Sequence, residues 1–470
     1  MRKTFFQLKE NKTSIRTEVL AGLTTFLTMA YIIFVQPAVL SGKMFGIQTG
    51  MDFGAITTAT CLSAALATVI MALYARYPIA QAPGMGENFF FVFSVIPAAT
   101  AAGFANAWQV ALGVVFISGV LFLILTLTKM QAYLIEAVSS SMKNGIAVGI
   151  GLFIAFIGMQ NAGVIVKASG TAVKLTSHFD SPDLAIFFFG LLLISVLHVR
   201  KIPGSILIGI AASTLLAIAT KSLIPHLPGA LQEAETVKDS LLMTRFEIIH
   251  QIVQPPPSLK PIFMKMDLAG ALSVSMIPFI IIFLFMDIFD TIGTLIGVSE
   301  QAGFVKNNKL PRADRALLAD AVGTVAGAGM GTSTVTSFVE SVTGIEQGGR
   351  TGLTGLTVAA LFLLALFFSP VIAMVGSYAP ITAPALVIVG AMMLQNVKKI
   401  QWDDYSESIP AFLMMIGIPL SYSIADGLII GFVSYPLIKF FSGKGKEVKG
   451  LMYVIALILA AYFFFLRSKM

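Results

Sequence analysis

The ten-residue run Phe285–Thr294 carries two carboxylates and two hydroxyls among Phe, Met and Ile. Its polar members are Asp287, Asp290, Thr291 and Thr294. Residues three or four apart share a helix face, so these side chains form one polar stripe. A carboxylate at the centre of a bilayer costs about 2.5–3.5 kcal/mol, so two on one face must meet protein, water or a ligand. The stripe predicts a ligand and proton site; the alternative is a hydrogen-bonded pair that locks two helices.

A second polar stripe follows about forty residues later. Its members, at helical spacing, are Ser333, Thr336, Ser337 and Glu340. The start, at 332–337, is rich in β-branched and hydroxyl residues, which favours an extended piece before a helix. Ser and Thr also pack between close membrane helices, which is the alternative reading. Glu340, an acid in an apolar stretch, favours the ligand site.

A third candidate segment, Ala82–Phe89, combines helix breakers with polar and aromatic residues. Pro83 and two glycines make a continuous helix unfavourable, and such breaks are tolerated at membrane depth where they line a cavity. Asn88 and Phe89 follow, and an aromatic ring beside a break could stack on a planar ligand. A Phe-rich stretch that faces lipid or core is the alternative. Gln36 offers a donor and an acceptor suited to a ring edge, or to helix packing.

The elements that must position these residues are membrane helices. The chain has 470 residues, of which 56% are hydrophobic and only 12% charged, against about 25% charged in soluble domains. Long apolar runs without strand alternation favour helices over a barrel. The net charge of +7 then reflects basic loops rather than a nucleic-acid partner. The single cysteine, Cys61, argues against a disulfide scaffold, and the lack of a His or Cys cluster at metal spacing argues against a metal site and an enzyme. The lack of a P-loop argues against an ATP-driven pump.

Fourteen apolar spans are expected, in two halves of seven separated by the polar stretch 225–268. They lie near 18–40, 52–75, 80–100, 107–128, 142–160, 183–198, 203–224, 269–298, 313–329, 332–347, 352–368, 371–395, 409–441 and 450–466. Because seven is odd, the halves run in opposite senses, as in inverted-repeat transporters, and Gly-Met-Gly recurs at 84–86 and 329–331. The run 409–441 is too long for one upright helix, and a hairpin of two helices is the alternative.

Basic residues predict the orientation. They precede the first span and follow even-numbered spans, which places the N-terminus in the cytoplasm. The lysines between positions 439 and 449 would be cytoplasmic only if 409–441 forms a hairpin. Two further acids within spans, Asp320 and Asp426, are expected to be structural.

Four motifs resemble the bacterial purine permeases of the azaguanine, hypoxanthine and adenine branch, within the nucleobase–ascorbate transporter superfamily. They are Ala30–Pro37, Ala82–Asn88, Phe289–Thr294 and Thr332–Ser341. The resemblance covers almost the whole chain. It implies an all-α polytopic fold of fourteen transmembrane segments in two inverted repeats, with short strands in the broken spans three and ten. It divides the chain into core (1–128 and 269–368), gate (129–224 and 369–470) and an extracytoplasmic loop (225–268).

The resemblance also implies roles for single residues. Asp290 and Glu340 would accept hydrogen bonds from a purine, Phe89 would stack on its ring, and Asp287 would carry the coupling proton. The other residues expected around the substrate are Gln36, Asn88, Thr336 and Ser337. Relatives often have Val-Asn-Pro where this chain has Gln36, and Leu-Asn-Ala where it has Glu87, Asn88 and Phe89. The choice among adenine, guanine and hypoxanthine therefore stays open.

The sequence thus predicts a proton-coupled purine nucleobase importer that works by an elevator mechanism. It is expected to be a multi-pass, homodimeric protein of the inner (cytoplasmic) membrane, with no cofactor besides H⁺ and no nucleic-acid partner. A uniporter or channel, or an anion exchanger of related fold, is the alternative.

Overall fold

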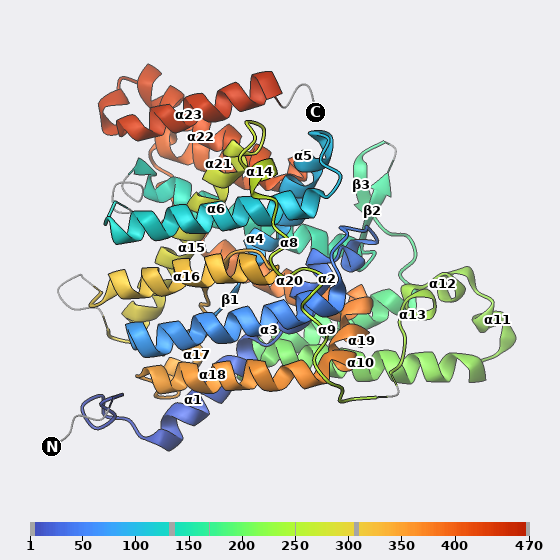
Figure 1. Ribbon diagram of the computed structural model, residues 1–470. Helices are drawn as coiled ribbons and strands as arrows, with labels where there is room; N and C mark the ends of the chain where they lie inside the picture. The colour runs from blue at the N-terminus through green and yellow to red at the C-terminus, as the bar shows by residue number, and fades with distance from the viewer. Residues whose placement is uncertain (1–4, 131–136, 169, 250, 305–309, 467–470) are drawn as a thin grey trace.

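Membrane-length helices dominate the computed structural model, which describes residues 5–130, 137–168, 170–249, 251–304 and 310–466 (Figure 1). Within these ranges ten helical segments are long and apolar enough to cross a membrane. They are Ile15–Leu40, Phe53–Ala75, Ala107–Leu127, Ser140–Asn161, Pro182–Val199, Ser205–His226, Ile277–Ser299, Gly352–Ser377, Ala379–Lys399 and Ile424–Phe441. The prediction of a mostly helical, multi-span membrane protein is confirmed.

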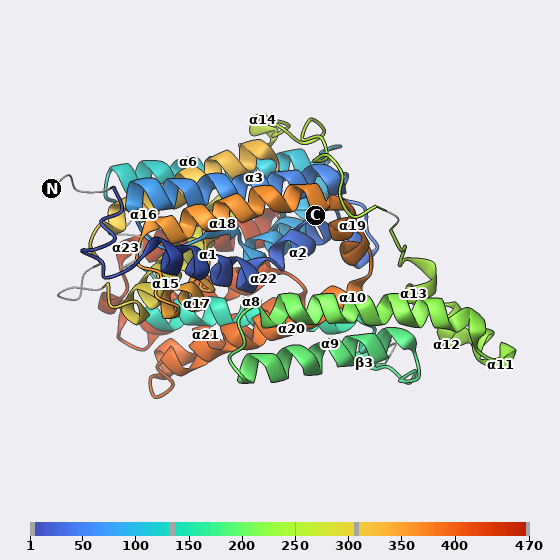
Figure 2. The same ribbon diagram turned by 90° about the horizontal axis from the view of Figure 1, so that it is seen from below.

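The long helices pack in two groups, each of which combines helices from both halves of the chain. The first contains α1 (Ile15–Met29), α3 (Phe53–Ile70), α6 (Ala107–Leu127), α15 (Ile277–Gln301), α16 (Ala313–Met330) and α18 (Gly352–Ala365). The second contains α8 (Ser140–Asn161), α9 (Pro182–Val199), α10 (Ser205–Leu223), α20 (Ala379–Met393), α21 (Tyr405–Ser421) and α22 (Ile424–Phe441). Figure 2 shows α9, α10, α20 and α21 below α3, α6, α16 and α18.

Two spans are broken near the middle of the molecule, and their broken parts meet. β1 (Gln81–Pro83) pairs antiparallel with β4 (Val335–Ser337), so that Ala82 lies opposite Thr336. After β1 the chain continues as α4 (Met85–Phe90), the π-helical turn η3 (Phe91–Val95) and α5 (Ile96–Ala101). After β4 it continues as α17 (Ser341–Glu346). The short strands predicted in these two spans are therefore present.

The run 409–441 is a hairpin rather than one span. α21 and α22 pack on each other and are separated by Tyr422 and Ser423 alone. Tyr422 adopts a left-handed backbone conformation (φ 57°), which reverses the chain. Lys444, beyond α22, is consequently 2.8 Å from Asp404, the cap of α21, so both lie at the same end of the hairpin. The predicted span 450–466 is α23 (Gly450–Ala461) followed by η8 (Tyr462–Leu466).

The predicted boundary between the eleventh and twelfth spans is wrong. We expected a break between 368 and 371, but the helix continues from α18 through η5 (Leu366–Phe368) into α19 (Ser369–Ser377) and breaks at Tyr378. Pro370 lies in the first turn of α19, where a missing backbone N–H costs nothing. Tyr378 is extended and precedes Ala379 and Pro380 in the first turn of α20.

A second departure from the sequence prediction is a β-hairpin beyond α8. β2 (Ile165–Ala168) pairs antiparallel with β3 (Ala172–Leu175), and no strand was expected there. The remaining short elements are α2 (Ile32–Leu40), η1 (Lys43–Phe45), η2 (Met71–Ala75), η4 (Ile224–His226), α11 (Gly229–Gln232), α12 (Glu235–Lys238), α13 (Leu241–Thr244), α14 (Leu268–Ala271), η6 (Leu394–Lys399) and η7 (Gly445–Glu447).

Asp183, in the first turn of α9, docks the connection 225–268 onto the second helix group. Its carboxylate accepts hydrogen bonds from the backbone N–H groups of Leu241 (2.7 Å) and Leu242 (2.9 Å) at α13. It also accepts one from Tyr378 Oη (2.7 Å). One buried carboxylate therefore ties α9, α13 and the break before α20 together.

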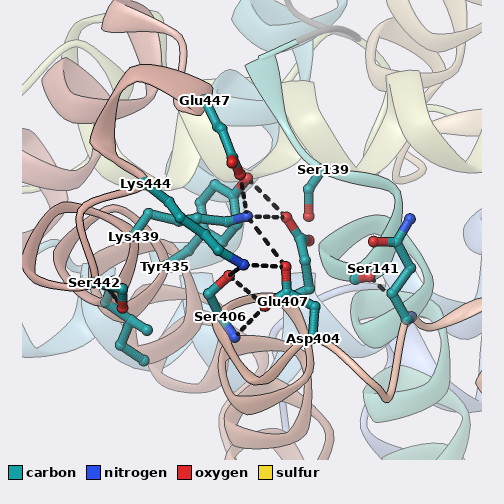
Figure 3. A network of polar contacts seen from close by, with 12 residues as sticks. Ser139, Ser141, Asp404, Ser406, Glu407, Tyr435, Lys439, Ser442, Lys444 and Glu447 are labelled. Carbon is teal, nitrogen blue, oxygen red and sulfur yellow. Dashed lines mark hydrogen bonds and ion pairs between the residues drawn. The ribbon is translucent and has the colours of Figure 1, made fainter.

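An ion-pair cluster ties α21, α22 and η7 together at the end of α22 that lies away from the turn at Tyr422 (Figure 3). The Lys439 ammonium, almost fully buried, lies 2.9 Å from Glu407 Oε1 and 2.8 Å from Glu447 Oε2. Lys444 binds Asp404 at 2.8 Å, and this hydrogen bond holds the pKa of the Asp404 carboxyl well below its ordinary value. The hairpin is therefore fixed at its open end by charge pairing.

Candidate ligand-binding site

The crossing of β1 and β4 is the frame of the candidate site. Gly84 follows β1, and its N–H donates to the Thr334 carbonyl (3.0 Å). A Cβ at Gly84 would collide with the Glu87 carboxylate and lie 2.9 Å from Thr336 Cγ2. Only glycine therefore permits this close approach of the two broken spans.

Asp320 of α16 joins the two strands to α15. Its carboxylate is fully buried and accepts hydrogen bonds from Gln81 Nε2 (2.7 Å), Thr291 Oγ1 (2.7 Å) and Ser337 Oγ (3.2 Å). Gln81 belongs to β1 and Ser337 to β4, so this one side chain positions both strands against α15. Ser337, which we expected to contact the ligand, instead donates its hydroxyl hydrogen to Asp320.

Asp290 is the acid of the polar stripe that remains exposed. It accepts a hydrogen bond from Thr336 Oγ1 (3.2 Å), and Thr336 Oγ1 also lies 2.9 Å from Thr291 Oγ1. The exposed carboxylate and the central residue of β4 are thus in direct contact. Asp290 and Thr336, predicted from separate segments, come together as expected for one site.

Asp287 lies one helical turn away and has a different environment. It is almost fully buried and accepts a hydrogen bond from Thr324 Oγ1 of α16 (3.0 Å). Its Oδ1 atom is buried with no hydrogen-bond partner among the described residues. The predicted stripe therefore separates into an exposed acid and a buried acid with one unsatisfied oxygen.

Glu340 immediately precedes α17 and is bound by a residue that was not predicted from the sequence. Tyr31 Oη donates to Glu340 Oε1 (3.0 Å), and both side chains are buried. Tyr31 lies within the motif Ala30–Pro37, where only Gln36 was selected. Its position inside that motif was the one signal that could have identified it.

Gln36 and Asn88 hold the chain that leads into β4. Gln36 Nε2 donates to Thr332 Oγ1, and Ser333 Oγ donates to Asn88 Oδ1. Gln36 Oε1 is buried without a partner among the described residues. Both predicted residues therefore lie at the crossing and contact residues 332–333, and Gln36 keeps one free acceptor.

Phe89 is enclosed by other aromatic rings. It lies parallel to Phe93, with ring centroids 6.0 Å apart and 8° between the planes. Phe45 and Phe153 lie at 6.0 and 6.1 Å, and Phe89 has no exposed surface. In this conformation a ligand could stack on Phe89 only if a neighbouring ring moved.

No group of three or more potential metal ligands occurs among the described residues.

Comparison with known proteins identifies the family of this chain. The Xan_ur_permease model, described as a permease family, matches residues 16–463. The chain is 43% identical to the guanine/hypoxanthine permease PbuG of Bacillus subtilis, over 99% of this chain and 100% of that protein. It is 37% identical to the adenine permease AdeP of Escherichia coli, over 97% and 95%.

A solved structure shares the fold. It is the transmembrane domain of the cyanobacterial bicarbonate transporter BicA, with a TM-score of 0.59, 15% identity, and coverage of 88% of this chain and 97% of that one. The relatives are transporters, which confirms both the predicted resemblance and the prediction that the chain is not an enzyme. The chain belongs to the Xan_ur_permease family, whose members include guanine/hypoxanthine and adenine permeases.

Proposed function

We propose that this permease imports a purine nucleobase: adenine, guanine or hypoxanthine. The observation that carries the proposal is the exposed Asp290 carboxylate, held by Thr336 at the crossing of the two broken spans. An ionised carboxylate only accepts hydrogen bonds, and purines present ring N–H donors to it. Relatives of full length named for guanine/hypoxanthine and for adenine support the substrate class.

Glu340 is the second proposed acceptor, and Phe89 is the proposed stacking ring. Tyr31 holds Glu340 in place, as the hydrogen bond of 3.0 Å indicates. Phe89 begins the aromatic cluster on α4, two residues after Glu87, and a planar base would replace one of its ring neighbours. Gln36 Oε1 offers a further acceptor at the same crossing.

Asp287 is the proposed proton carrier. One of its carboxyl oxygens is buried without a partner in the part of the chain that the structure describes, and a buried unpaired charge is costly. A proton on that oxygen removes the charge, so the loaded and empty states would differ in the cost of moving through the membrane. This difference couples the proton gradient to purine uptake.

We further propose an elevator mechanism with fourteen transmembrane segments in two inverted repeats, in which the hairpin helices α21 and α22 are the thirteenth and fourteenth segments and α23 lies outside the repeats. The helix group that carries Asp290 would slide against the group of α8–α10 and α20–α22. The hairpin at 409–441 returns Lys439 and Lys444 to the end of Asp404, which fits basic loops on the cytoplasmic side together with the N-terminus. We expect a homodimer in the cytoplasmic membrane.

Uptake by purified protein in liposomes tests the proposal. Radiolabelled hypoxanthine, guanine and adenine should accumulate when the outside is acidic, and a protonophore should abolish accumulation. Accumulation that survives the protonophore would refute proton coupling. A channel or uniporter would equilibrate purines without accumulation, and an anion exchanger of the fold shared with BicA would move bicarbonate instead.

Substitutions test the separate roles of Asp290 and Asp287. Asp290→Asn should lower hypoxanthine affinity at least tenfold, because a lost hydrogen bond to a charged group is worth about 1.5–3 kcal/mol. Asp287→Asn should keep exchange of labelled for unlabelled hypoxanthine but lose pH-driven accumulation. Asp314→Asn, exposed on α16, is the matched control and should resemble the wild type. Wild-type affinity in Asp290→Asn would remove Asp290 from the site.

A further inference from the structure

A cavity of about 330 Å³ lies beyond the aromatic cluster that encloses Phe89. Its aromatic walls are Phe93, Phe279, Tyr422 and Tyr462, which come from η3, α15, the α21–α22 turn and η8. Hydroxyl groups of the α21–α22 turn and the carboxylate of Asp426 add polar groups to the lining. Four rings and a carboxylate suit a planar aromatic ligand that carries N–H donors.

The cavity is separate from the Asp290 site because its lining includes none of the site residues and extends along the helical run that follows Phe89. Phe93 lies one turn after Phe89, and Ala98 and Ala101 on α5 line the cavity beyond it. At 1.5 Å per residue, the twelve positions from Phe89 to Ala101 correspond to roughly 18 Å. Phe89 has no exposed surface, whereas Ala101 is exposed, so the cavity opens away from the enclosed cluster.

Tyr422 lines the cavity and contacts the aromatic cluster that encloses Phe89. Its ring contacts Phe93 and Phe153 with centroids 5.7 and 5.5 Å apart, both edge to face. Its hydroxyl donates to Gln160 Oε1 on α8. Its left-handed backbone is unfavourable for a bulky residue, so the conformation is held by these contacts and by the hairpin. Loss of the contact with Phe93 would connect the cavity to Phe89.

We infer that this cavity is a capture site, at which a purine base stacks before Phe93 and Tyr422 separate and admit it to Asp290. The inference rests on the proposed function and adds a second, earlier binding position for the same substrate class. The base would stack among the aromatic walls and donate N–H groups to Asp426. The ring centroids of Tyr462 and Phe279 are 5.6 Å apart, edge to face, so η8 supplies one wall of the site.

Thiol protection tests the site directly. Cys61 is the single cysteine of the chain and is fully buried, so a cysteine placed at Ala101 is the reactive one. Millimolar hypoxanthine should slow modification of Ala101→Cys by a charged methanethiosulfonate at least threefold. It should leave Leu227→Cys, exposed on the connection after α10, unchanged.

The same measurement in an Asp290→Asn background separates the two positions. Protection of Ala101→Cys that persists without Asp290 supports a distinct capture site. Protection that disappears with Asp290 means that purine acts on Ala101 only through the central site, and this would overturn the inference while the proposed function stands. Failure of the wild-type protein to transport any purine would instead overturn the proposed function.

Kinetics provide a second, independent test. Tyr462→Ala removes one stacking wall and should raise the KM for hypoxanthine uptake about five- to tenfold, with the maximal rate changed less than twofold. Phe463→Ala, at an exposed ring on the next residue, is the matched control and should leave KM unchanged. A KM within twofold of wild type in Tyr462→Ala would overturn the inference, as would an equal increase in Phe463→Ala.

Discussion

Asp320→Ala tests whether one buried carboxylate holds the strand crossing together. The substitution leaves three donors, on Gln81, Thr291 and Ser337, without their acceptor. Each hydrogen bond to a charged group is worth about 1.5–3 kcal/mol, which bounds the loss at roughly 9 kcal/mol. Partial repacking of the donors reduces it, and we expect about 4–6 kcal/mol.

Thermal unfolding of the detergent-solubilised protein measures the loss. With an unfolding entropy of about 2.1 cal/mol/K per residue, a chain of 470 residues loses roughly 1 °C in Tm per kcal/mol. Asp320→Ala should therefore melt about 4–6 °C below wild type. Asp314→Ala, exposed in the first turn of the same helix, should change Tm by about 1 °C or less.

Binding gives the functional consequence of the same change. Because the crossing places Thr336 beside Asp290, loosening it should weaken hypoxanthine binding at least tenfold. Asp320→Asn keeps one acceptor oxygen but turns an amide toward a donor, so both losses should be intermediate. A Tm for Asp320→Ala within 1 °C of wild type would refute the view that Asp320 holds the two strands on α15.

The other two predictions concern carboxylates and ammonium groups of the second helix group. Asp183→Ala frees two backbone N–H groups of α13, so trypsin should cleave at Arg245 several-fold faster in limited proteolysis, and an unchanged rate would contradict the docking role. Lys439→Met leaves Glu407 without its cation and should destabilise by about 3–5 kcal/mol in thermal unfolding. Lys444→Met breaks a half-exposed pair that solvent screens and should destabilise much less than Lys439→Met. Equal losses in the two variants would show that burial does not decide the strength of these pairs.

Local chemistry was sufficient for several features of the site. Pro83 and the flanking glycines predicted the break in the third span, and the β-branched run at 332–337 predicted the strand in the tenth. The break and the strand could be predicted because backbone restrictions act on residues close in sequence. The two polar stripes are not preserved as helix faces, since 335–337 is a strand and Asp287 and Asp290 have different environments.

Other features depended on partners distant in sequence. Asp320 binds groups that are 17, 29 and 239 residues away, and Tyr31 binds Glu340 across 309 residues. The helix break at Tyr378 was missed because Pro370 is accommodated in a first turn, which spacing alone does not reveal. The enclosure of Phe89 likewise needs rings from η1, η3 and α8.

The sequence by itself determined that this protein lies in the membrane, that its few intramembrane acids are costly, and that two spans are interrupted. Those conclusions follow from composition and from steric limits of single residues. Only the tertiary structure decided which acid is exposed and which is buried with an unsatisfied oxygen, since Asp287 and Asp290 differ only in what packs against them. It also decided that the turn at Tyr422 meets Phe93, because that contact joins segments more than 300 residues apart.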